Sequence, residues 1–145
     1  MIYTTLTKKA INLAFKAHKH KIGQDGVPYI CHPLHLAEQL TDELTTVVAL
    51  LHDVVEDTDI SVENIKDSGF PDEVVDAISV ITRNKNDSYE EYIMKVKTNK
   101  LATIVKITDL KHNLDVSRLC VDCIDSKISN RMNKYRKALT VLEEP

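Results

Sequence analysis

The chain has 145 residues, of which 43% are hydrophobic and 28% are charged, and its formal net charge is −3 at pH 7. A chain of this length and composition can bury a hydrophobic core unaided, so we expect one domain over residues 1–145. The slightly acidic balance disfavours duplex nucleic acid or an anionic membrane as the main partner. A small anionic ligand can still bind through local lysine and arginine side chains.

The N-terminal segment MIYTTLTKKA lacks the charged-then-apolar pattern of a secretory signal. No apolar run approaches the roughly 18 residues that a membrane-spanning helix needs, so we expect a cytoplasmic protein. The three cysteines, Cys31, Cys120 and Cys123, cannot all pair within one chain. The C-x-x-C formed by Cys120 and Cys123 lacks a second ligand pair, so we expect ordinary packing there rather than a zinc or redox site.

Only three glycines and four prolines interrupt the chain, and no stretch shows sustained period-two alternation, so the sequence predicts an all-α fold. Apolar spacing indicates a helical bundle of about seven or eight helices. Ser61 can cap one short helix, and Ser88 with Glu91 has the spacing of a capping box for another. In chain order, the predicted helices cover approximately residues 6–17, 33–40, 44–57, 61–69, 71–81, 89–96, 104–114 and 128–139.

The stretch LLHDVVEDT, residues 50–58, places charged groups in an otherwise strongly apolar helix. At about 100° per residue, its polar side chains share one side of that helix, opposite the valines; they are His52, Asp53, Glu56 and Asp57. A solvated acidic face is the plain alternative. However, a histidine embedded among apolar residues is costly unless its charge or lone pair is compensated. A divalent cation compensates clustered carboxylates and accepts a neutral imidazole, so we interpret this stretch as part of a metal site.

Two other segments offer partners for such a site. PYICHPLHLAEQ places His32 at a loop-to-helix boundary that prolines stiffen. KITDLKHNL places Asp109 in a helix, with Lys106 and Asn113 on nearly the same side. Each residue alone is a weak signal, because single helical aspartates and histidines are usually structural. Together they supply two imidazoles and two carboxylates from three separate elements.

The His52-Asp53 pair, with a histidine upstream and an aspartate downstream, resembles the HD superfamily of metal-dependent phosphohydrolases. In order and spacing, PYICHPLHLA, ALLHDVVEDT and KITDLKHNL resemble the hydrolase domain of the RelA/SpoT alarmone enzymes and their small stand-alone relatives. The resemblance runs from about Leu6 to Ser117. It implies an HD-type phosphohydrolase domain that holds Mn²⁺ and removes a 3′-diphosphate from guanosine tetra- or pentaphosphate.

The resemblance also implies roles for individual residues. The implied metal ligands are His32, His52, Asp53 and Asp109. Glu56 and Asp57 match an acidic pair that positions or activates the attacking water, and a carboxylate near a metal site suits that role. Imidazole and carboxylate ligands also accept other divalent transition metals, so manganese comes from the resemblance alone. The candidate substrate-binding residues are Lys21, Lys106, Asn113 and Arg118.

The chain departs from the alarmone hydrolases at the rim of the site. Those enzymes typically carry an arginine that packs on the guanine base, five residues beyond the histidine that ends the first helix. Counted from His18, this chain has Gly23 there, without a cation–π partner. We expect His18, His20 and His35 at the rim or surface, and His112 in a structural role beside the ligands. We expect Arg131, Lys134 and Arg136 on the exposed side of the last helix, and Tyr89 and Tyr92 in core or capping positions.

Three functions therefore remain in view, and the oligomeric state stays open. The leading one is a metal-dependent alarmone hydrolase acting on a small nucleotide. The second, motivated by Gly23, is a phosphohydrolase for another nucleotide or a phosphorylated cofactor. The third is a regulatory module that binds metal or nucleotide without turnover, and the retained acidic pair Glu56 and Asp57 argues against it.

Overall fold

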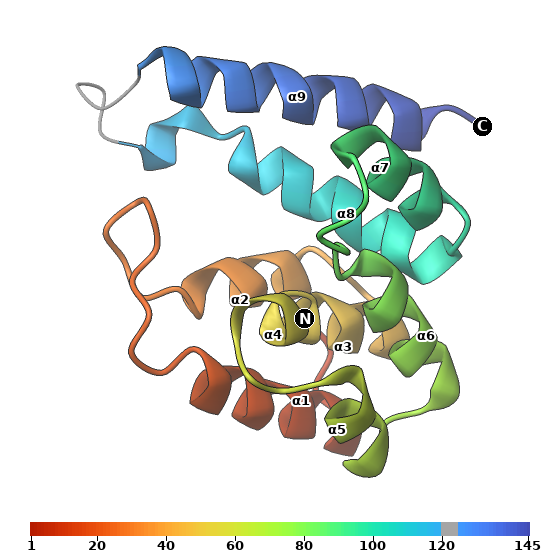
Figure 1. The fold of residues 1–145 in the computed structure, drawn as a ribbon. Coiled ribbons are helices and arrows are strands. Elements are labelled where there is room, and N and C mark those ends of the chain that lie inside the picture. The colour runs from red at the N-terminus through yellow and green to blue at the C-terminus, as the bar shows by residue number, and fades with distance from the viewer. Residues whose placement is uncertain (120–124) are drawn as a thin grey trace.

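The computed structural model describes residues 1–119 and 125–145, and within them the chain is all-α, as predicted (Figure 1). The described residues contain no β-strand, and the one isolated bridge joins Ile22 to Pro28. Cys120 and Cys123 lie outside the described residues. The helices are α1 (Thr5–Ala17), α2 (Cys31–Glu38), α3 (Glu43–Leu51), α4 (Val54–Asp57), α5 (Val62–Asp67), α6 (Asp72–Ile81), α7 (Tyr89–Lys97), α8 (Lys100–Asn113), the 3₁₀ turn η1 (Val116–Arg118) and α9 (Ser126–Glu143).

The helix starts that the sequence indicated are confirmed by their hydrogen bonds. Ser61 caps α5 and Ser88 caps α7, each in a capping box with the side chain three residues later. After α5 the chain turns at Gly69, whose φ of +90° suits glycine because it has no Cβ. These capping residues are reliable sequence signals, because their side chains accept hydrogen bonds from amide groups that a helix end leaves without a partner.

The predicted single helix over residues 44–57 was wrong, because the structure divides it at His52 and Asp53 into α3 and α4. The imidazole Nδ1 of His52 lies 2.6 Å from the carbonyl oxygen of Ala49. In a continuous helix, that oxygen accepts from the amide four residues on, at Asp53. The histidine ring therefore takes the acceptor that would have continued the helix, and the polar residues do not share one helical face.

Helix α3 forms the centre of the core. Seven of its nine residues, Thr45 to Leu51, are buried, and it packs against α1, α2, α6 and α8. Burying one leucine or valine side chain contributes roughly 1.5–3 kcal/mol, so α3 is firmly held. The largest fully buried side chains are Leu36, Leu50, Leu51, Ile65, Ile78, Leu110, Val47, Val48, Val54, Val74, Val96 and Val105. This rigid packing holds the break at His52 and Asp53 in place.

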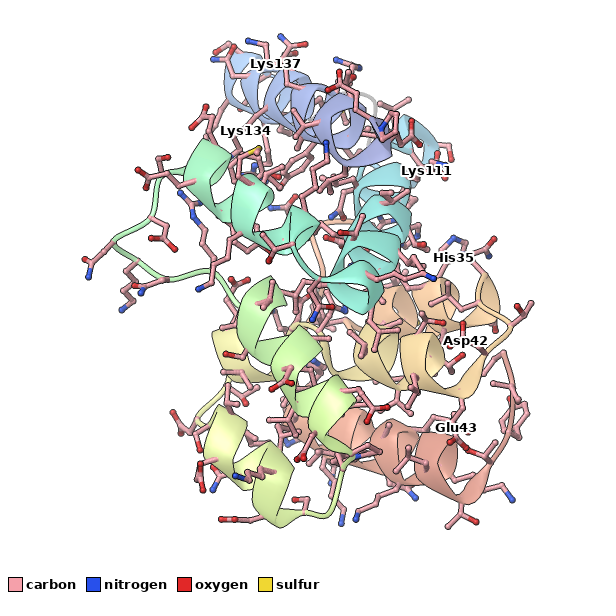
Figure 2. The ribbon with its side chains drawn as sticks, turned by 90° about the vertical axis from the view of Figure 1, so that its right-hand side faces the viewer. His35, Asp42, Glu43, Lys111, Lys134 and Lys137 are labelled. Atoms are coloured by element: carbon pink, nitrogen blue, oxygen red, sulfur yellow. The ribbon has the colours of Figure 1, made fainter. Side chains whose placement is uncertain are left out.

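The second half of the chain builds on this core. Helix α8 packs against α3, α6 and α2 on one side and against α7 and α9 on the other. Figure 1 shows α9 running alongside α8, at the side of the molecule opposite α1 and α5. Figure 2 shows the same separation, with Lys134 and Lys137 at the α9 end and Asp42 and Glu43 in the half formed by α1 and α3. No helix among the described residues is long and apolar enough to cross a membrane.

Candidate metal centre and active site

His32 lies in the first turn of α2 and is 7% exposed. Its Nε2 is 2.8 Å from Oδ1 of Asp109, and its Nδ1 is 2.7 Å from Nδ1 of His112. Burial lowers the pKa of His112 to about 4, with a further contribution from Arg118, so its ring is neutral and its Nδ1 can accept a hydrogen bond from Nδ1 of His32. Such a hydrogen bond orients a metal-binding imidazole through the nitrogen that does not bind the metal. His112 thus lies where its predicted structural role requires.

His52 lies at the break between α3 and α4 and is 3% exposed. Because its Nδ1 faces the Ala49 carbonyl oxygen, Nδ1 carries a proton, and in the neutral ring the lone pair is on Nε2. Nε2 is buried without a hydrogen bond, at 3.0 Å from Oδ2 of Asp53 and 3.6 Å from Oδ1 of Asp109. A buried nitrogen that lacks a hydrogen-bond partner and faces two carboxylates is a candidate ligand atom.

Asp109 lies in the middle of α8, and both of its carboxylate oxygens accept hydrogen bonds. Lys106 donates to Oδ2 at 2.7 Å, and Asn113 donates to Oδ1 at 3.0 Å. Burial raises the pKa of Asp109, but Lys106 and the two histidines outweigh it and hold that pKa well below 3.8. The carboxylate is therefore ionised and fixed in orientation.

The three side chains form a compact group. His32, His52 and Asp109 each offer one ligand atom, and these atoms lie within 4.8 Å of one another. Asp53 adjoins this group through His52, and its Oδ2 also accepts a hydrogen bond from the hydroxyl of Tyr29. Burial lowers the pKa of His52, but the two carboxylates outweigh burial and hold that pKa well above 6.5. The group thus favours a positive charge at its centre. A divalent cation supplies that charge while the imidazoles stay neutral, so the donor set fits a metal ion.

The predicted catalytic pair lies beside this group on α4, and both residues line the cavity described below, with the Asp57 side chain 28% exposed. Glu56 accepts a hydrogen bond at 2.9 Å from the backbone amide of Arg83. Partial burial raises the pKa of Glu56 above 4.5, although the Arg83 amide opposes the shift. Asp57 forms an ion pair with Lys21 at 2.8 Å. The two carboxylates therefore have different environments: within residues 1–119 and 125–145, Asp57 pairs with a cation and Glu56 does not.

A cavity of about 360 Å³ opens beside the candidate metal group. Apart from the buried His52, every predicted site residue lines it: Lys21, His32, Asp53, Glu56, Asp57, Lys106, Asp109, Asn113 and Arg118. The predicted substrate-binding cations are not free, because Lys106 is paired with Asp109, Lys21 with Asp57, and Arg118 with Asp25. Their contact with substrate stays a prediction.

The sequence analysis did not predict two of the cavity residues, and it misplaced one histidine. Arg131 and Tyr135 of α9 line the cavity, so the expectation that Arg131 lies on the exposed side was wrong. A signal was present, because Arg131 and Tyr135 are four residues apart on the same helix face as the apolar Ile128 and Met132. His18, expected at the rim or surface, is only 2% exposed, and its ring packs 4.9 Å from that of Tyr29.

The fold and the site together define a class of protein: an all-α domain in which histidines and aspartates from separate elements form a candidate site for a divalent metal. Residues 10–106 match the HD domain family, and the chain belongs to that family. A solved structure described as a metazoan orthologue of SpoT that hydrolyses ppGpp superposes with a TM-score of 0.83 at 23% identity. The superposition covers 99% of this chain and 88% of that chain, so the two share a fold.

Curated bacterial proteins resemble the chain in sequence. It is 30% identical over 127 residues to a probable GTP pyrophosphokinase of Mycobacterium leprae, covering 79% of this chain and 16% of that protein. It is 29% identical over 119 residues to the guanosine-3′,5′-bis(diphosphate) 3′-pyrophosphohydrolase of Aquifex aeolicus, covering 74% and 17%. For the enzyme of the same name from Borreliella burgdorferi, identity is 30% over 144 residues, covering 83% and 21%. The chain thus spans only 16–21% of the length of these relatives.

Proposed function

We propose that the protein is a metal-dependent hydrolase that removes the 3′-diphosphate from guanosine tetra- or pentaphosphate. The observation that carries this proposal is the buried group of His32, His52 and Asp109, which adjoins a cavity that the acidic pair on α4 also lines. Relatives named as guanosine-3′,5′-bis(diphosphate) 3′-pyrophosphohydrolases support the choice of substrate. Mn²⁺ is the proposed metal, held by the two histidines with Asp53 and Asp109.

The chemistry follows from the residues around the cavity. When bound, a divalent cation supplies positive charge beside the phosphoryl oxygens and makes a nearby water more acidic. Glu56, which pairs with no cation among the described residues, accepts the proton of the attacking water. The water oxygen attacks the phosphorus attached to the ribose 3′ oxygen, and the bond between that phosphorus and the 3′ oxygen breaks. The 3′ oxygen takes up the proton through solvent and leaves as the hydroxyl of the nucleotide product, while the released diphosphate keeps the water oxygen. Asp57, which follows Glu56 in sequence, orients the water, and Lys21, paired with Asp57, contacts a phosphate oxygen.

A second candidate, hydrolysis of a different nucleotide or a phosphorylated cofactor, is favoured by one specific observation. A Cβ atom at Gly23 would lie 2.8 Å from Oδ1 of Asp25, so in this loop the Asp25 carboxylate occupies the space beside position 23. The arginine that packs on guanine in the alarmone hydrolases is absent there. The catalytic centre therefore matches the alarmone hydrolases better than the nucleotide-binding rim does, which leaves room for a different base or substrate.

The test is release of pyrophosphate from guanosine tetraphosphate in the presence of Mn²⁺, measured beside a panel of other nucleoside phosphates and phosphorylated nicotinamide cofactors. Glu56→Gln should lower kcat by about 10²–10⁴-fold while metal binding and folding persist. Glu63→Gln, an exposed substitution in the first turn of α5, is the matched control and should leave kcat unchanged. Preference for a non-guanine substrate would reject the alarmone assignment, and unchanged turnover in Glu56→Gln would reject the catalytic role.

A further inference from the structure

The end of the cavity away from the candidate metal group has a different character. Its walls come from the loop between α1 and α2, from the segment that contains η1, and from the first turns of α9. Figure 1 shows these three segments gathered on one side of the molecule. Their apolar contributions to the cavity lining are Ile22, Pro28, Leu119, Ile128 and Met132. The far end of the cavity therefore combines these apolar side chains with charged ones, among them Asp25, Arg118 and Arg131.

An ion pair holds this far end together. Nη2 of Arg118 lies 3.0 Å from Oδ2 of Asp25, which is 93 residues away in sequence. Nη1 of Arg118 donates to the carbonyl oxygen of His112 at 2.8 Å, near the end of α8. The guanidinium group is therefore held at two of its nitrogens, and the Arg118 side chain lines the cavity while keeping 23% of its area exposed.

The loop is built around this pair. Oδ1 of Asp25 accepts from the amide of Val27 at 3.3 Å, which turns the carboxylate inward. In this position the carboxylate occupies the space next to Gly23, since a Cβ there would approach Oδ1 to 2.8 Å. A side chain at position 23 would therefore push the Asp25 carboxylate out of its present position. Glycine at this position leaves room for the Asp25–Arg118 pair.

We propose that Arg118, held by Asp25, is the surface on which the nucleobase of the substrate stacks. This inference rests on the proposed function, because a nucleotide whose reacting phosphate lies at the metal group extends its base toward the far end of the cavity. A planar guanidinium stacks well on aromatic rings and is only weakly hydrated. Its fixed orientation reduces the conformational entropy lost when the base binds. The apolar walls bury the rest of the ring.

The surrounding charges favour a base over a phosphate at this position. Asp25 already pairs with the charge of Arg118, and Asp115 also lines the cavity. With Arg118 and Arg131, these carboxylates leave no net positive charge at this end to attract a polyanion, whereas an uncharged ring keeps the stacking contact. Arg118 therefore determines affinity for the nucleoside part of the substrate and contributes little to binding of its phosphates.

The experiment measures binding to the Mn²⁺-loaded Glu56→Gln protein, in which turnover is suppressed, by calorimetry. The probes are guanosine tetraphosphate, its adenosine counterpart and inorganic pyrophosphate. Adding Arg118→Ala should raise the Kd of the preferred nucleotide about tenfold, while the Kd of pyrophosphate changes less than about twofold. Arg118→Lys should behave like Arg118→Ala, because lysine keeps the charge but has no planar group. Arg136→Ala, on the exposed surface of α9, is the control and should change neither Kd.

Two gentler variants keep the test valid if Arg118→Ala unfolds. Asp25→Asn removes the ion pair, and Gly23→Ala displaces the Asp25 carboxylate, so both should weaken nucleotide binding severalfold without weakening pyrophosphate binding. Equal weakening of nucleotide and pyrophosphate binding, or rescue by Arg118→Lys, would show a phosphate contact and overturn the stacking role. The stacking role would also be overturned if the nucleotides bound no more tightly than pyrophosphate. If this selective loss of binding appears although the wild-type protein hydrolyses none of these nucleotides, the proposed hydrolysis fails and the stacking role stands.

Discussion

Nε2 of His32 lies 2.8 Å from Oδ1 of Asp109, although the two residues are 77 positions apart and belong to α2 and α8. This contact connects the two helices at the candidate metal group. Both atoms are buried, so without a cation the contact depends on the histidine proton and on Lys106 beside the carboxylate. A divalent cation at this point would join α2, α8 and the break after α3.

Chelation should therefore lower the thermal stability of the protein. A ligand present at about 100 times its Kd stabilises the native state by about 2.7 kcal/mol, which for a chain of this size corresponds to roughly 5–10 °C in Tm. The measurement is a thermal melt of the Mn²⁺-loaded protein before and after treatment with EDTA. His32→Ala should abolish the difference between the two melts, whereas His20→Ala, an exposed substitution, should preserve it. Equal melting temperatures with and without EDTA in the wild-type protein would count against a buried ion.

The hydroxyl group of Tyr29 should tune the affinity for metal. It donates a hydrogen bond to Oδ2 of Asp53, and burial together with the Asp53 charge holds the pKa of Tyr29 far above 10, so the hydroxyl stays protonated. Tyr29→Phe removes the donor and frees the carboxylate to rotate. Loss of a hydrogen bond that orients a ligand typically weakens metal binding about 10–100-fold. Metal titration followed by calorimetry measures this, with Tyr3→Phe on the surface as the control. An unchanged metal Kd would mean that this hydrogen bond does not orient a metal ligand.

The pH dependence of kcat should report the state of Glu56. Partial burial raises the pKa of this carboxyl above 4.5, and only its ionised form can accept a proton. The value of kcat should therefore be at its maximum at neutral pH and should fall as the pH drops through that raised pKa. The profile is recorded at saturating metal, with metal occupancy checked at each pH, because protonation of the histidine ligands also costs activity at low pH. The acid limb should be missing from the residual activity of Glu56→Gln, and a limb that persists unchanged would assign it to another group.

The outcome of the sequence reasoning differs between local and long-range features. The helix starts at Ser61 and Ser88 were predictable, because a capping side chain and the amide it satisfies are only three residues apart. The break at His52 was not, because it depends on an imidazole competing for the Ala49 carbonyl oxygen. Helical periodicity contains no information about such a competition, so the pattern favoured one continuous helix.

The same distinction holds for the site. His32, His52 and Asp109 were implied by motif order alone, and the structure brings them together. The pairing of Asp25 with Arg118 was not predictable, since it joins a loop to a 3₁₀ turn across 93 residues. The position of Arg131 was misjudged because a basic residue on an amphipathic helix is usually solvated. Its exposure depends on where α9 lies over the cavity, which is a tertiary property.

The last prediction concerns Asp42, which caps the central helix α3 and is labelled in Figure 2. Its Oδ1 accepts from the amide of Thr45 at 2.9 Å, and its Oδ2 accepts from the Thr45 hydroxyl. Burial raises the pKa of Asp42, but these hydrogen bonds outweigh burial and hold it below 3.8. The ionised cap therefore stabilises the folded state above pH 3.8, and this contribution is lost as the pH falls through the lower pKa of the folded protein.

Asp42→Ala should accordingly lower the free energy of unfolding by about 1 kcal/mol at pH 7, and the deficit should shrink in acid below about pH 4. Urea unfolding measures the difference. The metal-loaded protein is unfolded at pH 7, and the metal-free protein is unfolded at pH 7 and again below about pH 4. Asp42→Asn should retain most of the stability, because asparagine is an equally good cap. Asp76→Asn, exposed on α6, should change the stability by less than about 0.5 kcal/mol. If Asp42→Ala and Asp76→Asn proved equally stable, the cap would not contribute to holding α3.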